Sequence, residues 1–200
     1  MAYDPQIHHR RSIRLKGYDY TQAGLFFVTI CVQNRRCLFG EIPIVVSGMR
    51  GERASTRDAP TLVLNDAGKM VEREWLLLPE RFPNIKLHEF VVMPNHFHGI
   101  IEHVRAPLVG AQTEARLNHQ TNKPKHIGEI IGAFKSITTN CYIDGVKTKG
   151  WPVFDAKLWQ RNFWEHIIKT ETAYLNISNY IINNPRNWQA DSLRKAEATL

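Results

Sequence analysis

Four segments of the chain have the hydrophobic pattern of β-strands. Residues 25–32 (LFFVTICV) are a run of β-branched and aromatic side chains, which predicts a buried strand. Residues 85–92 and 96–103 flank a tight corner at 93–95 and predict the two strands of a hairpin. Residues 158–168 (LWQRNFWEHII) predict a fourth strand.

Three other segments repeat their apolar residues at helical spacing. They predict helices over residues 65–78, over 127–141 and from 170 to about 184. The residues expected to cap or end these helices are Asn65 or Asp66, Thr170 or Thr172, Pro79, Pro83 and Pro185.

The order of these elements predicts the fold class. Strand, helix, strand, strand, helix and strand make the split βαβ or ferredoxin-like arrangement, followed here by an additional helix. We therefore expect an α+β fold with an antiparallel sheet, helices on one face, and the other face free for a ligand or partner. A short hairpin is expected near 44–46 within the long loop 40–60, and the polar segment 106–124 is expected to be mobile.

Length and composition are those of one globular domain spanning residues 1–200, with a basic N-terminal arm at 1–23 and a polar tail at 189–200. The chain has 200 residues and is 43% hydrophobic. It contains no apolar run of the ~18 residues that cross a membrane, and no apolar segment of a secretory signal follows its charged start. Three cysteines without a CxxC motif favour neither a disulfide scaffold nor a thiolate zinc site. A cytoplasmic location is expected.

The charge of the chain favours a polyanionic partner. Twenty-six Lys and Arg against nineteen Asp and Glu leave a net charge of +7, and basic side chains release counterions from phosphate backbones. A solvated basic surface is the alternative interpretation. The candidate DNA-binding residues are Arg10, Arg11, Arg14, Lys16, Arg35, Arg36, Lys123, Lys125 and Arg161.

The first candidate chemical site is the pair His96 and His98. Residues two apart on a strand point to the same side, so both imidazoles project together while Phe97 turns into the core. Two imidazoles on one sheet face can bind a divalent metal ion. Two histidines that are simply exposed, or satisfied in the core, remain the alternative.

The second candidate site is the pair Tyr180 and Asn184. They are four residues apart and therefore share a helix face. The amide can complete a metal site, while the phenol, with an ordinary pKa of about 10, attacks once a base or a cation polarises it. The alternative is a tyrosine that packs and an asparagine that ends the helix before Pro185.

Three aromatic residues are candidates for stacking on unpaired bases. Strand alternation places Trp159 and Phe163 on one face, and Trp164 on the other with Asn162 and His166. A role in the core is favoured for these aromatic residues.

Three motifs, taken in order, resemble the single-tyrosine HUH transposase superfamily and, more narrowly, the REP-associated tyrosine transposases. They are Val91–His98 (VVMPNHFH), Trp159–His166 (WQRNFWEH) and Tyr180–Pro185 (YIINNP). The N-terminal RRSIRL at residues 10–15 and FFVT at 26–29 fit the same group, so that the resemblance covers roughly residues 10 to 188.

The resemblance implies the RNA-recognition-motif-like version of the ferredoxin-like sheet and an enzyme that cuts and rejoins single-stranded or hairpin DNA. It implies that His96 and His98 bind Mg²⁺ or Mn²⁺, that Asn184 is a third ligand, and that Tyr180 forms a 5′-phosphotyrosine. It further implies a monomer or homodimer, associated with the nucleoid, with no membrane and no small-molecule substrate. The physical match of imidazole ligands is better for manganese.

Two other functions are compatible with the same residues. A non-catalytic nucleic-acid-binding module would bind through stacking and charge on a ferredoxin-like sheet. A hydrolytic metallonuclease would activate water at the metal and use Tyr180 only structurally. A covalent adduct between protein and DNA distinguishes the enzyme that attacks through tyrosine from both.

Overall fold

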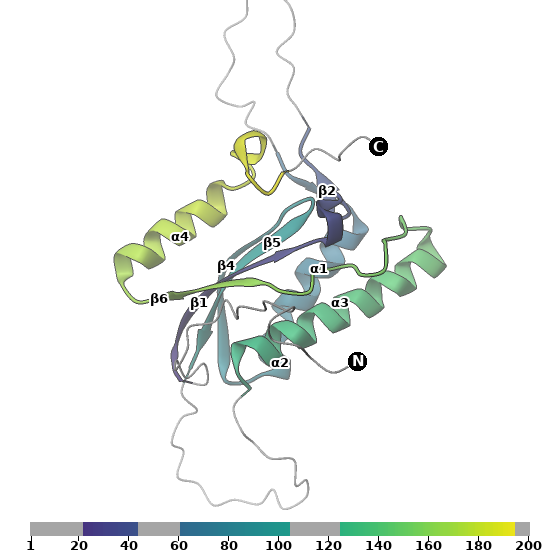
Figure 1. Cartoon of the computed structure of the whole chain (residues 1–200). Coiled ribbons are helices and arrows are strands. Elements are labelled where there is room, and N and C mark those ends of the chain that lie inside the picture. The colour runs from purple at the N-terminus through teal and green to yellow at the C-terminus, as the bar shows by residue number, and fades with distance from the viewer. Residues whose placement is uncertain (1–21, 44–60, 105–124, 195–200) are drawn as a thin grey trace, which may run out of the picture.

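The computed structural model describes residues 22–43, 61–104 and 125–194 (Figure 1). The expected hairpin near 44–46, the polar segment 106–124 and nearly all of the basic arm lie outside these residues.

A four-stranded antiparallel sheet is the centre of the fold. Its strands are β1 (Gly24–Cys31), β4 (Ile85–Val92), β5 (His96–His103) and β6 (Trp164–Ile168), in the spatial order β4-β5-β1-β6. The predicted strand at 25–32 and the predicted hairpin are thus confirmed. A second, two-stranded sheet was not predicted: the very short β2 (Gly40–Glu41) and β3 (Val63–Leu64) bring the ends of the 40–60 loop together.

The strand predicted over 158–168 is wrong in its first half. Only Trp164–Ile168 pairs continuously with β1, while Trp159 makes an isolated bridge to Val32. Val32 pairs with Trp159, and Thr29 pairs with Trp164. The segment that contains β1 therefore covers three residues between these pairings, while the segment that leads into β6 covers five and so has two extra residues. Because this excess is even, Trp159 and Trp164 still face opposite sides of the sheet.

Three helices form where the periodic segments predicted them. The helices are α1 (Asp66–Leu76), α2 (Leu78–Arg81), α3 (Ile127–Lys149) and α4 (Glu171–Asn183), with short 3₁₀ turns η1 (Gln33–Arg35) and η2 (Trp188–Ala190). Helix α3 extends eight residues beyond its predicted end, and the short α2 was not predicted. Asn65 caps α1 and Thr170 caps α4 through their side-chain oxygens. The expectation that Pro79 ends a helix needs correction, because α1 stops before it and Pro79 lies in the first turn of α2, where a missing N–H costs nothing.

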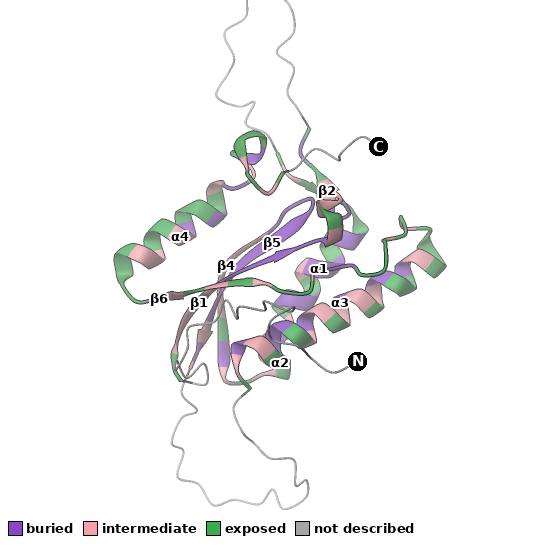
Figure 2. Ribbon diagram, viewed as in Figure 1, coloured by how far each residue is buried: buried purple, intermediate pink, exposed green. Residues whose placement is uncertain are grey.

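The main core lies between one face of the sheet and the helices α1 and α3 (Figure 2). Trp75 of α1 is fully buried against Phe97 and Phe134. Its ring also lies over Gly99, where an added Cβ would come within 2.6 Å of it. β5 therefore has a glycine at this position because only a residue without a side chain admits the indole.

The other face of the sheet is partly covered by α4, contrary to the expectation that it is free (Figure 1). Ile181 of α4 packs with Ile100 and Ile168, which project from β5 and β6 on that face. Among the described helices, none is long and apolar enough to cross a membrane. The face under α4 is where the histidine pair projects.

Candidate active site

Strand β5 holds His96 and His98 on the α4 side of the sheet. The two rings lie 4.6 Å apart, centre to centre, and both side chains are buried. Phe97 between them is fully buried in the opposite core, as alternation predicted. A strand buried on both faces therefore keeps two polar rings side by side.

The hydrogen bonds of Asn95 determine which nitrogen of His96 carries a proton. The amide nitrogen of Asn95 donates to the carbonyl oxygens of Arg35 (3.1 Å) and Leu193 (3.0 Å), which leaves its Oδ1 facing Nδ1 of His96 at 2.8 Å. Because Oδ1 can only accept, Nδ1 must be the donor. Nε2 of a neutral His96 therefore keeps its lone pair, the form in which imidazole binds a metal.

His98 is held in the same way from the neighbouring strand. Its Nδ1 is bonded to the hydroxyl of Thr29 at 2.8 Å, and its ring stacks on Phe27 at 5.4 Å. This leaves Nε2 facing the phenol of Tyr180, 3.3 Å away. Strand β1 thus orients a ring that β5 carries.

Both imidazoles are neutral at physiological pH. Burial lowers the pKa of His96 to about 3, with Arg35 adding to the effect and the amide of Asn184 opposing it. Burial also lowers the pKa of His98 to about 3, helped by its neighbour His96 and opposed by Asp191. Two uncharged nitrogen acceptors are the result.

Helix α4 and its C-cap bring Tyr180 and Asn184 to the histidines, and Tyr180 meets His98 from 82 residues away along the chain. Tyr180 is 43% exposed, and its ring meets both Phe27 and His98 edge-on. Burial raises the pKa of the Tyr180 phenol, the charge of Asp191 raises it further, and the Asn184 amide lowers it. The phenol is therefore neutral and a weak nucleophile until a cation lies beside it.

A polar network fixes α4 on the sheet. Glu89, at the irregularity of β4, accepts hydrogen bonds from the hydroxyls of Tyr174 and Ser178, both at 3.0 Å. Burial acts to raise the pKa of Glu89, but the hydrogen bonds from its own backbone N–H and from these two hydroxyls outweigh it and lower the pKa below its usual value. These bonds hold the helix at positions two and six residues before Tyr180.

Asp191 is a further residue of the site, although its place in the polar segment 189–200 gave no indication of such a role. The tail turns at η2, where Trp188 is buried beside His96, and Arg35 donates to the carbonyl of Ser192 at 2.9 Å. Asp191 Oδ2 then lies 3.6 Å from Nε2 of His96, with only 6% of the side chain exposed. No sequence signal marks this residue, because a lone aspartate in a polar segment has no motif.

Three buried acceptor atoms meet here without a donor. Nε2 of His96, Oδ1 of Asn184 and Oδ2 of Asp191 have no hydrogen-bond partner among the described residues. Buried polar atoms are normally paired, so a group of unpaired acceptors is the arrangement that a cation satisfies. Within the described chain no three His, Cys, Asp or Glu residues form a group that could hold a metal ion, so a donor set here would have to include the amide of Asn184.

Four of the predicted DNA-binding cations lie in the described chain: Arg35, Arg36, Lys125 and Arg161. Arg35 is beside the site, where it holds the tail. Arg36 donates to the carbonyl of Val153 at 2.7 Å, and Lys125 pairs with Glu129 at 3.5 Å. The other five lie outside the described residues: Arg10, Arg11, Arg14, Lys16 and Lys123.

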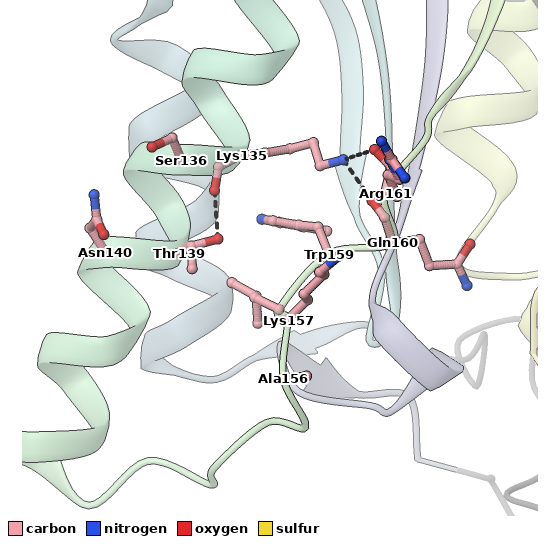
Figure 3. A pocket seen from close by; sticks show the side chains of 10 residues that line it. Lys135, Ser136, Thr139, Asn140, Ala156, Lys157, Trp159, Gln160 and Arg161 are labelled. Carbon is pink, nitrogen blue, oxygen red and sulfur yellow. Dashed lines mark hydrogen bonds between the residues drawn. The ribbon is translucent and has the colours of Figure 1, made fainter. Parts of the chain in front are cut away.

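A pocket of about 370 Å³ lies elsewhere, between α3 and the segment 156–161 (Figure 3). It is lined by three cations, Lys135, Lys157 and Arg161, but by none of the residues of the histidine and tyrosine cluster. The ammonium of Lys135 donates to the carbonyl oxygens of Gln160 (2.6 Å) and Arg161 (2.9 Å). The pocket is therefore a separate feature from the cluster around His96.

Comparison with known proteins finds a curated relative and several similar solved structures. A protein of Haemophilus influenzae, described as uncharacterized, is 40% identical over 198 residues that cover 96% of each chain. No family model matches. A solved REP-associated tyrosine transposase bound to a REP hairpin aligns with 81% of this chain and 66% of its own, at 18% identity and a TM-score of 0.45. A candidate transposase of Deinococcus radiodurans aligns with 85% and 95%, at 12% identity and a TM-score of 0.43.

Proposed function

The chain belongs to the same family as the Haemophilus influenzae protein, and we propose that it is a metal-dependent, transposase-type enzyme that cuts and rejoins single-stranded DNA through Tyr180. The observation that carries the proposal is the group of unpaired buried acceptors beside this phenol. The sheet order β4-β5-β1-β6 supports it, since this is the ferredoxin-like order expected from the motif resemblance.

The residues of the cluster fit a divalent metal ion. His96 and His98 offer neutral nitrogens, and Asn184 and Asp191 offer a carbonyl and a carboxylate oxygen. Mg²⁺ and Mn²⁺ prefer oxygen ligands, and a mixed set of nitrogen and oxygen suits Mn²⁺ better. When bound, such an ion supplies the positive charge that stabilises a reacting phosphate and lowers the pKa of a nearby phenol.

The residues of the chain then have distinct roles in cleavage. Tyr180 Oη forms a bond to phosphorus and loses its proton to solvent, while the bond to the 3′-oxygen breaks and that oxygen takes up a proton. The product is a 5′-phosphotyrosine and a free 3′-hydroxyl, and the reverse reaction rejoins the strand without ATP. Thr29 and Asn95 orient the histidine rings, and Glu89 holds α4 so that the phenol stays beside His98.

The test is the formation of a covalent adduct. The protein is incubated with Mn²⁺ and single-stranded hairpin DNA, and a complex that survives denaturation is sought. Tyr180→Phe removes one oxygen and should keep DNA binding but lose cleavage and adduct by several orders of magnitude.

Tyr174→Phe is the matched control, because it removes the other phenol of α4. It should lose its hydrogen bond to Glu89, which costs about 1–3 kcal/mol of stability, but keep cleavage and adduct. Cleavage by Tyr180→Phe at the wild-type rate would instead favour the metallonuclease that activates water. Binding without any cleavage by the wild-type protein would favour the non-catalytic module.

Metal removal provides a second readout. Excess EDTA should abolish cleavage and leave much of the DNA binding, since contacts from Lys and Arg to phosphate do not require the ion. His96→Ala should behave as the chelated protein does. Cleavage that persists in EDTA would remove the metal from the mechanism.

A further inference from the structure

Trp164 is a large aromatic side chain left exposed on the face of the sheet that carries the site. The other two aromatic candidates of its segment have core roles: Trp159 is buried and donates from Nε1 to Thr138 at 2.9 Å, and Phe163 packs against the main core. Trp164 is 64% exposed although it begins a strand. An exposed indole at this position has no packing explanation.

The register places Trp164 in one row with the site. It lies opposite Thr29 on β1, and Thr29 lies opposite His98 on β5. Residues directly opposite on neighbouring strands share a face, so the indole and the His98 ring project to the same side about 10 Å apart, two strand spacings. His166 and Phe27 form the next row on that face and are also opposite each other.

Helix α3 holds the backbone just before Trp164. The ammonium of Lys135 donates hydrogen bonds to the carbonyl oxygens of Gln160 and Arg161 (Figure 3). These residues lie in the segment between Trp159 and Trp164, where the two extra residues bend the chain. On the other side, Gln160 N–H donates to the carbonyl of Cys31 at 2.8 Å. The bend is thus fixed from two elements, and the indole that follows it is presented to the site face at a defined place.

We propose that Trp164 is a stacking platform for an unpaired base of the DNA strand whose phosphate lies at Tyr180. The inference rests on the proposed function and adds the contact that positions the strand. Stacking on an aromatic ring is tolerant of sequence, so the platform selects single strands over duplex rather than one base over another.

The test measures binding of fluorescent oligothymidylate in EDTA, so that no cleavage occurs. Trp164→Ala should lower affinity about 5- to 100-fold, the range for loss of one stacked base, and Trp164→Phe should keep most of the affinity. Val153→Ala is the matched control, because Val153 is equally exposed (66%) but precedes the bend and belongs to neither the site nor its row. It should bind as the wild type does.

An abasic oligonucleotide of the same length separates stacking from other causes. Wild type and Trp164→Ala should bind it equally, and the wild type should bind it more weakly than oligothymidylate. Equal binding of oligothymidylate by wild type and Trp164→Ala would overturn the inference. So would a loss of affinity for the abasic strand, on replacing Trp164 by Ala, that equals the loss for oligothymidylate. Because adduct formation is assayed separately with Mn²⁺, failure of the proposed function would appear there and not in this binding test.

Discussion

Single hydrogen bonds determine the chemical state of the site. Asn95 uses both amide hydrogens on backbone carbonyls, and this requires the proton of His96 to be on Nδ1. Burial keeps both imidazoles neutral, and Asp191 contributes the only carboxylate that the described residues place at His96. Each ring is therefore oriented by a neighbour that itself takes no part in the chemistry.

At this scale we predict that Asp191→Asn weakens binding of Mn²⁺. In the wild-type protein, Oδ1 of Asp191 accepts a hydrogen bond from the Leu193 N–H at 2.7 Å. The substitution keeps an oxygen that can accept this bond but removes a negative charge from the acceptor cluster. The dissociation constant for Mn²⁺, measured by calorimetry, should rise about 10-fold or more. Asp155→Asn, whose side chain is 70% exposed, is the control and should bind Mn²⁺ normally. An unchanged affinity for Asp191→Asn would reduce that residue to a support of the tail turn.

Helix α4 is the element on which the arrangement of the site depends. It carries Tyr180 and is joined to β4 by the two hydroxyl bonds to Glu89. Its outer side is solvent-exposed at Leu175 and Ile182, so only one face of the helix holds it on the sheet. Weakening that face should loosen the helix without unfolding the main core, which lies beyond the sheet.

We predict that docking of α4 depends on pH through Glu89. Its pKa is lower in the folded protein than the usual 4.5, so its carboxylate stabilises the docked helix fully above about pH 4.5. That contribution is lost as pH falls through the lower folded value. Hydrogen exchange of α4 amides, corrected for intrinsic rates, should show protection that falls on acidification below pH 4.5.

Glu89→Gln is the matched variant for this prediction. It should lose about 1–3 kcal/mol of helix protection already at neutral pH, since hydrogen bonds to a charged group become neutral ones. Its α4 protection should then change less with pH than that of the wild type, while α3 amides serve as the internal control in both. Identical pH profiles for the two proteins would show that Glu89 does not hold the helix.

The whole molecule is a basic protein with one covered and one partly open sheet face. The net charge of +7 gives a long-range attraction to DNA, whereas the site, its histidine pair and Trp164 occupy a single face. Of the cations expected to contact DNA, those of the arm lie outside the described residues. Charge and chemistry are thus separable by experiment.

At this scale we predict that DNA affinity falls steeply with salt and that deleting residues 1–16 flattens the dependence. The logarithm of the binding constant for single strands falls by about 0.7 per phosphate contact for each logarithmic unit of salt. The deletion removes Arg10, Arg11, Arg14 and Lys16. Fluorescence anisotropy over a salt series measures the slope, and Trp164→Ala is the control, because it removes no charge and should keep the slope. An unchanged slope after deletion would identify the arm as a solvated surface.

Duplex DNA should bind more weakly than hairpin DNA.

The sequence by itself determined most of the main helices and strands, though not the short β2 and β3 or the start of β6, and it determined the direction of the histidine pair. Alternation with a period of two is a local property, so His96 and His98 had to share a face once 96–103 was a strand, and the caps at Asn65 and Thr170 follow from local hydrogen bonds. Local pattern also placed Trp159 and Trp164 on opposite faces, although it did not reveal the bend between them.

Only the tertiary structure decided which side chains meet. The contact between Tyr180 and His98 spans 82 residues, and the approach of Asp191 to His96 depends on how η2 packs behind the corner after β4. Partners from other elements likewise determine that α4 covers the second sheet face and that β6 begins only at Trp164. A sequence pattern constrains neighbours along the chain, whereas burial and hydrogen bonding across the fold are settled by the packing of all its elements together.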